Sequence, residues 1–198
     1  MICYNKSWLR REGFLLRVIA GTAKKMILKS PRGEKTRPTA DRVKEAVFNI
    51  LADRIIDCNF LDLFAGTGSI AIEALSRGAA HAVLVEKDRP TVAIIKENLQ
   101  RTKLFQRAEI LHCDVFSAMK TLYQNNKNFD IIYIDPPYYK GYYQKVLNEV
   151  FNCHLLSPKG VVVVESSTQH LPPETVADLL RIRTQRYGDT TINFYQLT

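Results

Sequence analysis

The chain has 198 residues, of which 46% are apolar and 24% are charged, and its formal net charge is +8 at neutral pH. This size fits one well-cored domain with a small appendage and excludes a large multidomain architecture. Its apolar runs are far shorter than the roughly 20 residues of a membrane-spanning helix, so we expect no membrane contact and a cytoplasmic location. The four cysteines are widely spaced and include no Cys-x-x-Cys pair, which predicts reduced thiols and no metal site.

The positive charge is concentrated in the first quarter of the chain. Residues 1–45 contain 12 Lys and Arg against 4 Asp and Glu, whereas residues 46–198 contain 16 of each kind. A basic surface beside a neutral body is typical of proteins that bind polyanions. We therefore predict a basic N-terminal extension over residues 1–45 and a main domain over residues 46–198.

The first predicted elements lie in this basic extension. Two runs of aliphatic and basic residues, 14–20 and 24–29, flank a Gly-containing turn at residues 21–23, which indicates a short β-hairpin. After Pro38 the apolar positions keep helical spacing, which predicts a helix that leads into the main domain. These positions are Val43, Ala46, Val47, Ile50 and Leu51.

From residue 59 onward, short apolar runs alternate with segments of helical length. Buried parallel strands joined by helical crossovers would explain this pattern, so it predicts a doubly wound α/β sheet. Residues 181–187 and 191–197 flank Gly188-Asp189 and indicate a terminal hairpin that adds an antiparallel strand at one edge. The strands are expected at residues 60–64, 82–85, 108–112, 131–134 and 161–164, and the crossover helices at 69–77, 90–103, 116–124 and 142–156.

The first of these strands runs into residues 62–69 (DLFAGTGS) and then directly into a helix. Gly66 and Gly68 occupy the strand-to-helix turn, where side chains would obstruct a bound ligand. Glu86 follows the second strand, where a carboxylate can accept hydrogen bonds from both ribose hydroxyls of a nucleoside. The pattern therefore predicts a nucleoside-containing cofactor.

Charge separates the two cofactors that this pattern allows. A dinucleotide would bring its pyrophosphate close to Asp62, and the two like charges would repel. S-adenosylmethionine carries a sulfonium and an ammonium group against one carboxylate. A pocket that contains Asp62, Glu86 and Asp135 therefore favours S-adenosylmethionine.

Further residues are expected around the adenosine. Asp114, after the third strand, is a candidate acceptor for the adenine amino group, although an acid in this position is often only a helix cap. Val115 or Phe116 would lie against the ring. Phe64 in the glycine loop and Lys87 beside Glu86 complete the cofactor-binding residues that we predict.

The motif Asp135-Pro136-Pro137-Tyr138 ends the fourth predicted strand and is the most specific signal in the chain. The prolines fix the backbone and remove two N–H donors, which leaves carbonyl acceptors at the strand end. An exocyclic amine on an aromatic base is a poor nucleophile, because its lone pair is delocalised into the ring. If the Asp135 carboxylate and the Pro136 carbonyl each accept one N–H, the lone pair points at the sulfonium methyl. Tyr138 would stack on a base that is unpaired or flipped out.

Together these motifs resemble the class I S-adenosylmethionine-dependent amino-methyltransferases, which have a Rossmann-like sheet. Residues 17–21 (RVIAG), Pro31 and above all residues 37–51 (RPTADRVKEAVFNIL) resemble the RsmD family, the 16S ribosomal RNA guanine-N2 methyltransferases. The resemblance extends from about residue 17 to residue 197. It implies methylation at N2 of one guanine, position 966 in the usual rRNA numbering, within a 30S subunit or a precursor particle.

The resemblance also implies roles for individual residues and an RNA-binding role for the basic extension. We expect the protein to act as a monomer. The catalytic set would be Asp135, Pro136, Pro137 and Tyr138, and the cofactor would lie among Gly66, Gly68, Glu86 and Asp114. The expected RNA contacts are Arg17, Lys24, Lys25, Arg37 and Arg42.

Three alternatives remain open at this point. A DNA adenine-N6 methyltransferase can use the same four-residue motif, but the chain shows no obvious target-recognition domain. A glutamine methyltransferase of protein release factors more often has Asn in place of Asp135. A non-enzymatic RNA-binding protein with an inactive cofactor fold is disfavoured by the intact acids and glycines.

Overall fold

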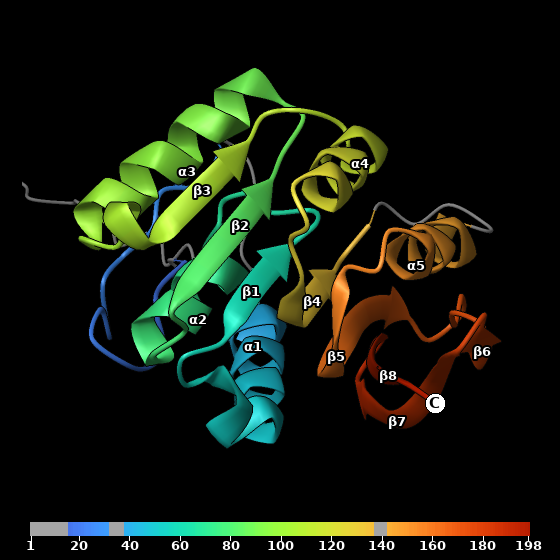
Figure 1. The fold of residues 1–198 in the computed structure, drawn as a ribbon. Helices are drawn as coiled ribbons and strands as arrows, with labels where there is room; N and C mark the ends of the chain where they lie inside the picture. The colour runs from blue at the N-terminus through green and yellow to red at the C-terminus, as the bar shows by residue number, and fades with distance from the viewer. Residues whose placement is uncertain (1–15, 32–37, 137–141) are drawn as a thin grey trace, which may run out of the picture.

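The computed structural model describes residues 16–31, 38–136 and 142–198, in which helices and strands alternate along most of the chain (Figure 1). The predicted strands and helices are present in the predicted order, with ends that differ by a few residues. The helices are α1 (Pro38–Leu51), η1 (Ala52–Ile55), α2 (Ser69–Arg77), α3 (Arg89–Arg101), η2 (Phe105–Arg107), α4 (Val115–Gln124) and α5 (Tyr142–Asn152), of which η1 and η2 are 3₁₀ helices. The strands are β1 (Asn59–Asp62), β2 (His81–Val85), β3 (Ala108–Leu111), β4 (Phe129–Ile134), β5 (Leu156–Ser167), β6 (Thr175–Val176), β7 (Leu179–Tyr187) and β8 (Thr190–Leu197).

The strands form one sheet in the order β3-β2-β1-β4-β5-β8-β7-β6. Strands β1 to β5 are parallel to one another, and β1 pairs with β2 on one side and β4 on the other. The chain therefore extends the sheet first in one direction from β1 and then in the opposite direction. In open α/β sheets, ligands bind at the carboxyl ends of the strands where the order reverses. The predicted doubly wound sheet is confirmed, and its reversal lies between β1 and β4.

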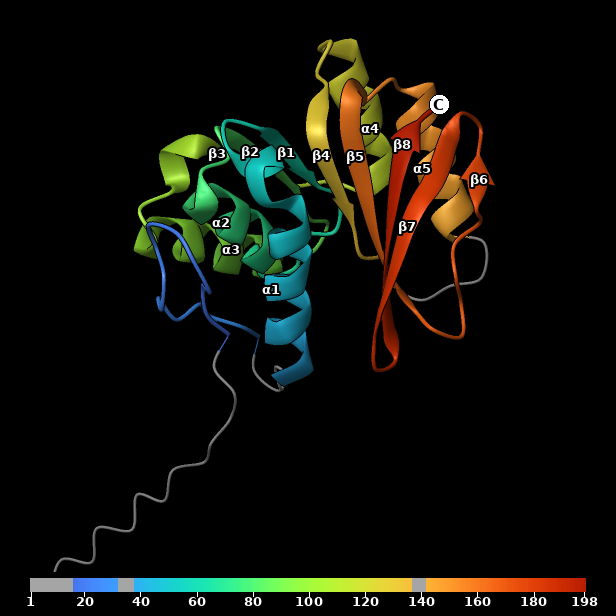
Figure 2. The ribbon, with the colours of Figure 1, turned by 90° about the horizontal axis from the view of Figure 1, so that it is seen from below.

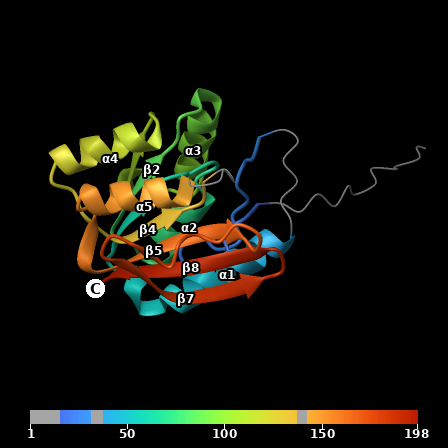
Figure 3. The same cartoon turned by 90° about the vertical axis from the view of Figure 1, so that its right-hand side faces the viewer.

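Two apolar cores cover the two faces of the sheet. Phe48 of α1, Ile72 of α2 and Ile95 of α3 belong to the core on one face, whereas Met119 of α4 and Leu147 of α5 belong to the core on the other. Figure 3 shows α4 and α5 above the sheet and α1 below it. Both faces of the central strands are buried, which explains their continuous apolar runs.

The fifth crossover helix ends earlier than the sequence pattern predicted. We expected a helix over residues 142–156, but α5 ends at Asn152, and this part of the prediction was wrong. His154 has a φ of 49°, a left-handed conformation that does not continue a helix. Leu156 already pairs with Phe129 of β4, because an apolar residue there gains more from the sheet than from another turn of exposed helix. As a result, β5 is longer than the predicted strand.

The terminal hairpin is confirmed, with one unexpected addition. β7 and β8 pair antiparallel on either side of Gly188-Asp189, and β8 is the strand that pairs with β5. The two-residue strand β6 was not predicted; it pairs only with the start of β7. None of the described helices is both long and apolar enough to cross a membrane.

The N-terminal segment, residues 16–31, doubles back on itself beside α2 and α3 (Figure 2). Its two arms meet in an isolated antiparallel bridge between Arg17 and Ile27. Backbone bonds also join Lys25 N–H to the Val18 carbonyl at 2.9 Å and Leu28 N–H to the Leu16 carbonyl at 2.8 Å. The predicted hairpin is present in outline, but its arms form no regular strands in the described residues.

A buried carboxylate on α2 holds this segment in place. Glu73 is fully buried and accepts hydrogen bonds from the backbone N–H groups of Ile19 at 2.7 Å and Ala20 at 3.0 Å. Arg77 Nε donates to the same carboxylate at 2.7 Å, and Lys44 Nζ lies 3.9 Å from it. Two cations and two peptide donors thus compensate the cost of burying the Glu73 charge.

The turn of the segment also requires close contact with α2. Gly21 has a φ of 80°, and a Cβ atom there would overlap the Ser76 carbonyl. Ser76 Oγ donates to the Ala20 carbonyl at 2.6 Å and accepts from Ala23 N–H at 2.9 Å. The basic N-terminal segment is therefore attached to the helix that follows the glycine loop.

We expect Glu73→Gln to destabilise the protein strongly. The neutral amide would leave Lys44 and Arg77 without their buried counter-charge, and breaking a buried ion pair on one side costs about 3–5 kcal/mol. The free energy of unfolding, measured by urea denaturation, should fall by about that amount. Glu97→Gln is the matched control, because the pair of Glu97 with Lys29 is exposed and should change stability by less than about 1 kcal/mol. Equal effects of the two substitutions would contradict the role of Glu73.

Candidate active site

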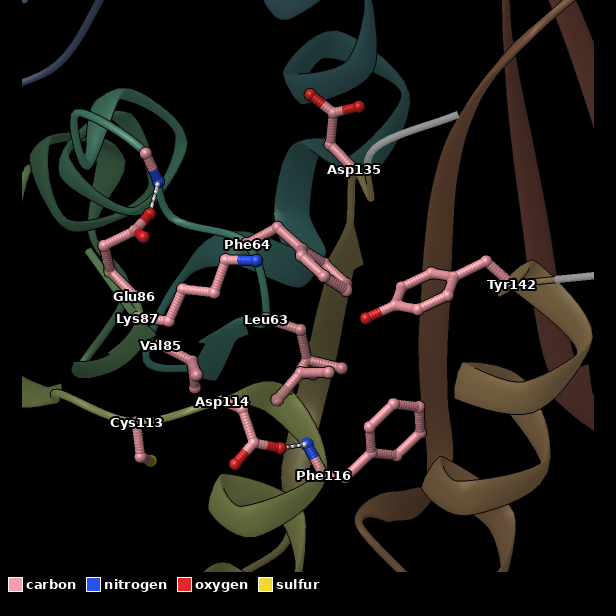
Figure 4. Close-up of a pocket in the computed structure, with 12 residues that line it drawn as sticks. Leu63, Phe64, Val85, Glu86, Lys87, Cys113, Asp114, Phe116, Asp135 and Tyr142 are labelled. Carbon is pink, nitrogen blue, oxygen red and sulfur yellow. Dashed lines mark hydrogen bonds between the residues drawn. The ribbon is translucent and has the colours of Figure 1, made fainter. Parts of the chain in front are cut away.

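A pocket of about 300 Å³ opens at the carboxyl ends of β1 to β4, at the reversal of strand order. Its lining comes from residues that follow β1, β2, β3 and β4 and from the starts of α4 and α5, and Figure 4 shows these side chains around the pocket. We call it the strand-end pocket. It is lined by Leu63, Phe64, Gly66, Val85, Glu86, Lys87, Cys113, Asp114, Val115, Phe116, Asp135 and Tyr142.

The two loop glycines have different surroundings. Gly66 lines the strand-end pocket, and a Cβ atom added to it would meet no other atom within 4 Å. A Cβ atom on Gly68 would instead approach the side chains of Leu84 at 3.2 Å and Ile95 at 3.4 Å. The proposed steric reason for glycine therefore agrees with the position of Gly66. Gly68 is not among the residues that line the strand-end pocket, so its place beside the ligand stays a prediction. Gly68 is small because α2, β2 and α3 pack tightly around it.

Glu86 connects the glycine loop to the end of β2. Its Oε2 accepts from Gly66 N–H at 3.1 Å, and its Oε1 accepts from Asp88 N–H at 2.9 Å. Figure 4 shows the first of these bonds at the edge of the pocket. Each carboxylate oxygen has a second lone pair, so Glu86 can still accept hydrogen bonds from a ligand in the pocket.

Asp114 is a helix cap and also lines the pocket. Its Oδ1 accepts from the backbone N–H groups of Phe116 at 3.0 Å and Ser117 at 3.1 Å, and Ser117 Oγ donates to Oδ2. These hydrogen bonds hold the pKa of Asp114 below its usual value, and the bond from the Ser117 hydroxyl has the largest effect. The cap and ligand roles that the sequence left open are compatible, because Oδ2 keeps a free lone pair.

Asp62 lies beneath the pocket and does not line it. The residue is 1% exposed, its Oδ1 accepts from Phe64 N–H at 3.3 Å, and its Oδ2 is buried without a hydrogen-bond partner among the described residues. Burial raises the pKa of Asp62 to about 7, and the nearby Glu86 carboxylate adds to the effect. Direct contact of Asp62 with a ligand is therefore not supported by the lining of the pocket.

Asp135 stands at the rim, just beyond the end of β4. Figure 4 shows its carboxyl group turned away from the aromatic rings of the pocket. Neither oxygen has a hydrogen-bond partner in the described part of the chain. Although the residue is solvent-exposed, protein atoms crowded around the carboxyl group raise its pKa, and the Glu165 and Asp62 carboxylates raise it further. Pro136, which follows, is buried, and the predicted catalytic residues Pro137 and Tyr138 lie outside the described residues.

Aromatic rings form one side of the pocket. The Tyr142 ring lies 6.0 Å from that of Phe64 and 6.1 Å from that of Phe116, in edge-on arrangements. Tyr142, together with Leu63, Val85 and Cys113, was not predicted from the sequence. Tyr142 is the first residue of α5, and only the packing of α5 beside α4 brings it here.

The chemistry of this pocket fits S-adenosylmethionine. The carboxylates Glu86, Asp114 and Asp135 favour a cationic ligand that also carries hydroxyl and amino donors. The apolar and aromatic side of the pocket suits an adenine ring. Because Gly66 has no side chain, a ligand can approach the backbone of the loop closely. In the described part of the chain, no cluster of three or more His, Cys, Asp and Glu side chains could hold a metal ion.

The predicted RNA contacts gather around a different depression. A hollow of about 460 Å³, which we call the basic hollow, is lined by Arg17, Val18, Ile19, Lys24, Lys25, Asp41, Arg42 and Glu45. Arg17 Nε contacts Asp41 Oδ2 at 3.3 Å in a largely exposed ion pair. Arg37, the fifth expected contact, lies outside the described residues. Four of the five predicted basic residues thus share one surface.

The chain is similar to known proteins along nearly its whole length. A family model described as conserved hypothetical protein 95 matches residues 16–196. The chain belongs to this family, the RsmD family. RsmD-family relatives include a putative rRNA methyltransferase, YlbH, of Bacillus subtilis, which is 35% identical over 91% of this chain and 98% of its own length. Ribosomal RNA small subunit methyltransferase D of Escherichia coli is 33% identical, with 91% and 89% covered.

A solved structure agrees with this assignment. The Escherichia coli protein yhhF, described as a putative methyltransferase, superposes with a TM-score of 0.81 at 30% identity, and the match covers 92% of this RsmD-family chain and 98% of that one. The Rossmann-like fold of a class I methyltransferase, predicted from the sequence, is thereby confirmed.

We expect Asp62 to make the stability of this RsmD-family protein fall as pH rises. Its pKa is about 7 in the folded protein, against 3.8 in the unfolded chain, so the folded state retains a proton that the unfolded state loses. Stability therefore decreases between about pH 4 and pH 7, by at most ~4 kcal/mol for this difference in pKa. In Asp62→Asn, the fall in melting temperature from pH 5 to pH 8 should be visibly smaller.

Asp88→Asn is the control for this titration. The Thr91 side chain and backbone hold the pKa of Asp88 below its usual value. The contribution of Asp88 to stability therefore changes with pH in the opposite direction, and it is lost only below about pH 4. The substitution of Asp88 should leave the fall in melting temperature between pH 5 and pH 8 unchanged. If the wild type and Asp62→Asn lose stability in parallel, the buried Asp62 carboxyl is not the group that titrates.

Proposed function

We propose that this protein transfers a methyl group from S-adenosylmethionine to the exocyclic N2 of a guanine in 16S ribosomal RNA. One observation carries the proposal: Gly66 and Asp135 line the same pocket, at the carboxyl ends of two adjacent parallel strands. The glycine loop and Asp135, the first residue of the Asp-Pro-Pro-Tyr motif, therefore share one cavity. The relatives in Bacillus subtilis and Escherichia coli, a putative rRNA methyltransferase and a ribosomal RNA small subunit methyltransferase, support the choice of RNA as substrate.

The strand-end pocket supplies the groups that would hold the cofactor. When bound, S-adenosylmethionine provides an electrophilic methyl group on its sulfonium. Glu86 would accept hydrogen bonds from the ribose hydroxyls, and Asp114 would accept one from the adenine amino group. Phe64 and Phe116 would contact the ring, and Gly66 would allow the loop backbone to approach the ligand closely.

Asp135 and Pro136 would prepare the nucleophile. The Asp135 carboxylate and the Pro136 carbonyl each accept one N–H of the target amine, which draws the nitrogen toward tetrahedral geometry and exposes its lone pair. Methylation makes this nitrogen acidic, so its proton leaves late and requires no strong base. The raised pKa of Asp135 makes its carboxylate a suitable acceptor for that proton.

The basic N-terminal segment would bind the RNA backbone. Arg17, Lys24, Lys25 and Arg42 surround the basic hollow, and lysine and arginine contacts to phosphates supply most of the sequence-independent affinity for nucleic acids. We further propose that the substrate is a 30S subunit or a precursor particle and that the enzyme acts as a monomer. A ribosomal substrate implies a cytoplasmic location.

The function is tested by offering four substrates with radiolabelled S-adenosylmethionine. These are 30S particles, naked 16S RNA, DNA and a release factor. We expect label in ribosomal RNA, at N2 of a single guanine when the product is digested to nucleosides. Label in DNA adenine or in release-factor glutamine would replace our proposal by one of the alternatives, and no label in any substrate would favour a non-catalytic RNA-binding role.

We expect Asp135→Asn to reduce methyl transfer by at least ~100-fold, the typical effect of removing one preorganised group from a transition state. The amide has one hydrogen-bond acceptor fewer than the carboxylate, and it lacks the negative charge that stabilises the nitrogen as it becomes cationic. Single-turnover rates should show the loss, whereas calorimetric cofactor affinity should change by only a few-fold. Asp178→Asn, in the exposed connection between β6 and β7, makes the same chemical change at the opposite end of the sheet and should have full activity. A normal rate for Asp135→Asn would exclude its role.

We also expect the triple substitution of Arg17, Lys24 and Lys25 by Gln to weaken the salt dependence of RNA binding. Three lost phosphate contacts reduce the slope of log affinity against log salt by roughly two to three. Lys120, Lys127 and Lys145 are exposed on or beside α4 and α5, and their substitution by Gln removes the same charge from the opposite face of the sheet. Equal slopes for the two triple variants would place the RNA contacts elsewhere.

A further inference from the structure

A second cavity lies on the other side of Asp135 from the strand-end pocket. It measures about 160 Å³ and lies on the α1 side of the sheet; we call it the inner hollow. Asp135 lines both cavities, and Asp41 lines both the inner hollow and the basic hollow. The inner hollow therefore lies between the cofactor site and the basic surface. It is lined by Leu16, Asp41, Val43, Lys44, Ser69, Ile70, Tyr133, Asp135 and Glu165.

Glu165 presents a free acceptor to this hollow. Ile134 and Val164 pair in the parallel register of β4 and β5, so the next residues, Asp135 and Glu165, lie side by side on neighbouring strands, about 4.8 Å apart. The Tyr133 hydroxyl donates to Glu165 Oε2 at 2.6 Å and fixes the side chain. Among the described residues, no group donates to Glu165 Oε1. The hollow thus contains two adjacent carboxyl groups with unused acceptor atoms.

Lys44 adds a donor on the wall formed by α1. Its side chain is 4% exposed, and its Nζ donates to the Arg17 carbonyl at 2.6 Å and to Ser69 Oγ at 3.1 Å. The Glu73 carboxylate, at 3.9 Å, is too far for a good hydrogen bond, so one ammonium proton has no acceptor in the described part of the chain. Leu16, Val43 and Ile70 supply apolar surface for the faces of a flat ring.

We propose that the inner hollow receives the target base and that Glu165 selects guanine by accepting a hydrogen bond from its N1–H. This inference rests on the proposed function and specifies the residue that recognises the base. Guanine presents two adjacent donors, N2–H and N1–H, followed by the acceptor O6. Asp135, Glu165 and Lys44 offer the complementary sequence of acceptor, acceptor and donor.

The same three groups disfavour the other bases that carry an exocyclic amine. Adenine and cytosine each present one amine donor followed by a ring nitrogen that is an acceptor. With that amine at Asp135, the ring nitrogen lone pair would face the Glu165 carboxylate. Two buried acceptors would then confront each other without a proton, which is the kind of mismatch that gives the largest discrimination between ligands.

2-Aminopurine separates the recognition of N1 from the chemistry at N2. It has the same exocyclic amine as guanine, but its N1 is an acceptor without hydrogen and it lacks O6. The probe is a 30S particle reconstituted from ligated 16S RNA that carries either guanine or 2-aminopurine at the methylated position. The wild type should methylate the guanine particle at least ~100-fold faster in kcat/KM, since a site built to bond a donor rejects analogues that lack it.

Glu165→Gln tests the assignment directly. The amide oxygen can still accept from Tyr133, while the amide NH₂ can donate to N1 of 2-aminopurine and opposes N1–H of guanine. We expect the preference for guanine to shrink by at least ~10-fold, with cofactor affinity and melting temperature close to those of the wild type. The control Glu109→Gln changes an exposed residue of β3 and should keep the wild-type preference.

The outcomes separate the two proposals. If the wild type methylates no guanine particle, the proposed function fails. If it methylates guanine and 2-aminopurine particles equally well, the function stands and the role of Glu165 is overturned, even if Glu165→Gln does not fold. An unchanged preference in a folded Glu165→Gln variant overturns that role as well. Tyr133→Phe, which only releases the Glu165 side chain, should reduce the preference by a smaller factor than Glu165→Gln.

Discussion

The parallel pairing of β1 with β4 is the constraint on which the site depends. The chain leaves β1 toward α2 on one face of the sheet and leaves β4 toward α5 on the other. Neighbouring strand ends whose connections diverge in this way leave a crevice between them. Residues that are 69 positions apart in sequence, Gly66 and Asp135, therefore line one pocket. A different strand order would separate them whatever the local motifs were.

This arrangement concentrates negative charge where the sheet is least able to solvate it. Asp62 is fully buried, and the Asp135 and Glu165 carboxyl groups lie beside each other close above it. Burial raises the pKa of all three groups, and repulsion by Glu165 and Asp62 raises the pKa of Asp135 further. Such a cluster does not stabilise the free protein, since apolar residues would pack there at lower cost. In the function that we propose, the cluster binds a cationic ligand and N–H donors, which relieve the repulsion.

The N-terminal segment depends on the same architecture. Glu73 and Ser76 of α2 hold its backbone, and Asn98 of α3 joins it to the glycine loop, because the Asn98 amide bonds both Lys29 and the Thr67 carbonyl. The basic residues are therefore fixed relative to the strand ends. Through Asp41 and Asp135, the basic hollow, the inner hollow and the strand-end pocket adjoin one another in that order. The division of the chain near residue 45 stays a prediction, although residues on both sides of it share one core.

The sequence by itself determined the elements, the direction of the sheet and the motif residues at its strand ends, because apolar periodicity and proline and glycine positions act locally. It identified Glu86, Asp114 and Asp135 for this reason. Only the tertiary structure decided which groups share a cavity: Tyr142 and Glu165 reach the site through packing and strand register, whereas Asp62 lies beneath it and Gly68 serves helix packing. Such contacts join residues far apart in the chain, so no local pattern specifies them. The end of α5 was also decided by the sheet, because Leu156 pairs with β4 where helical propensity alone would have continued the helix.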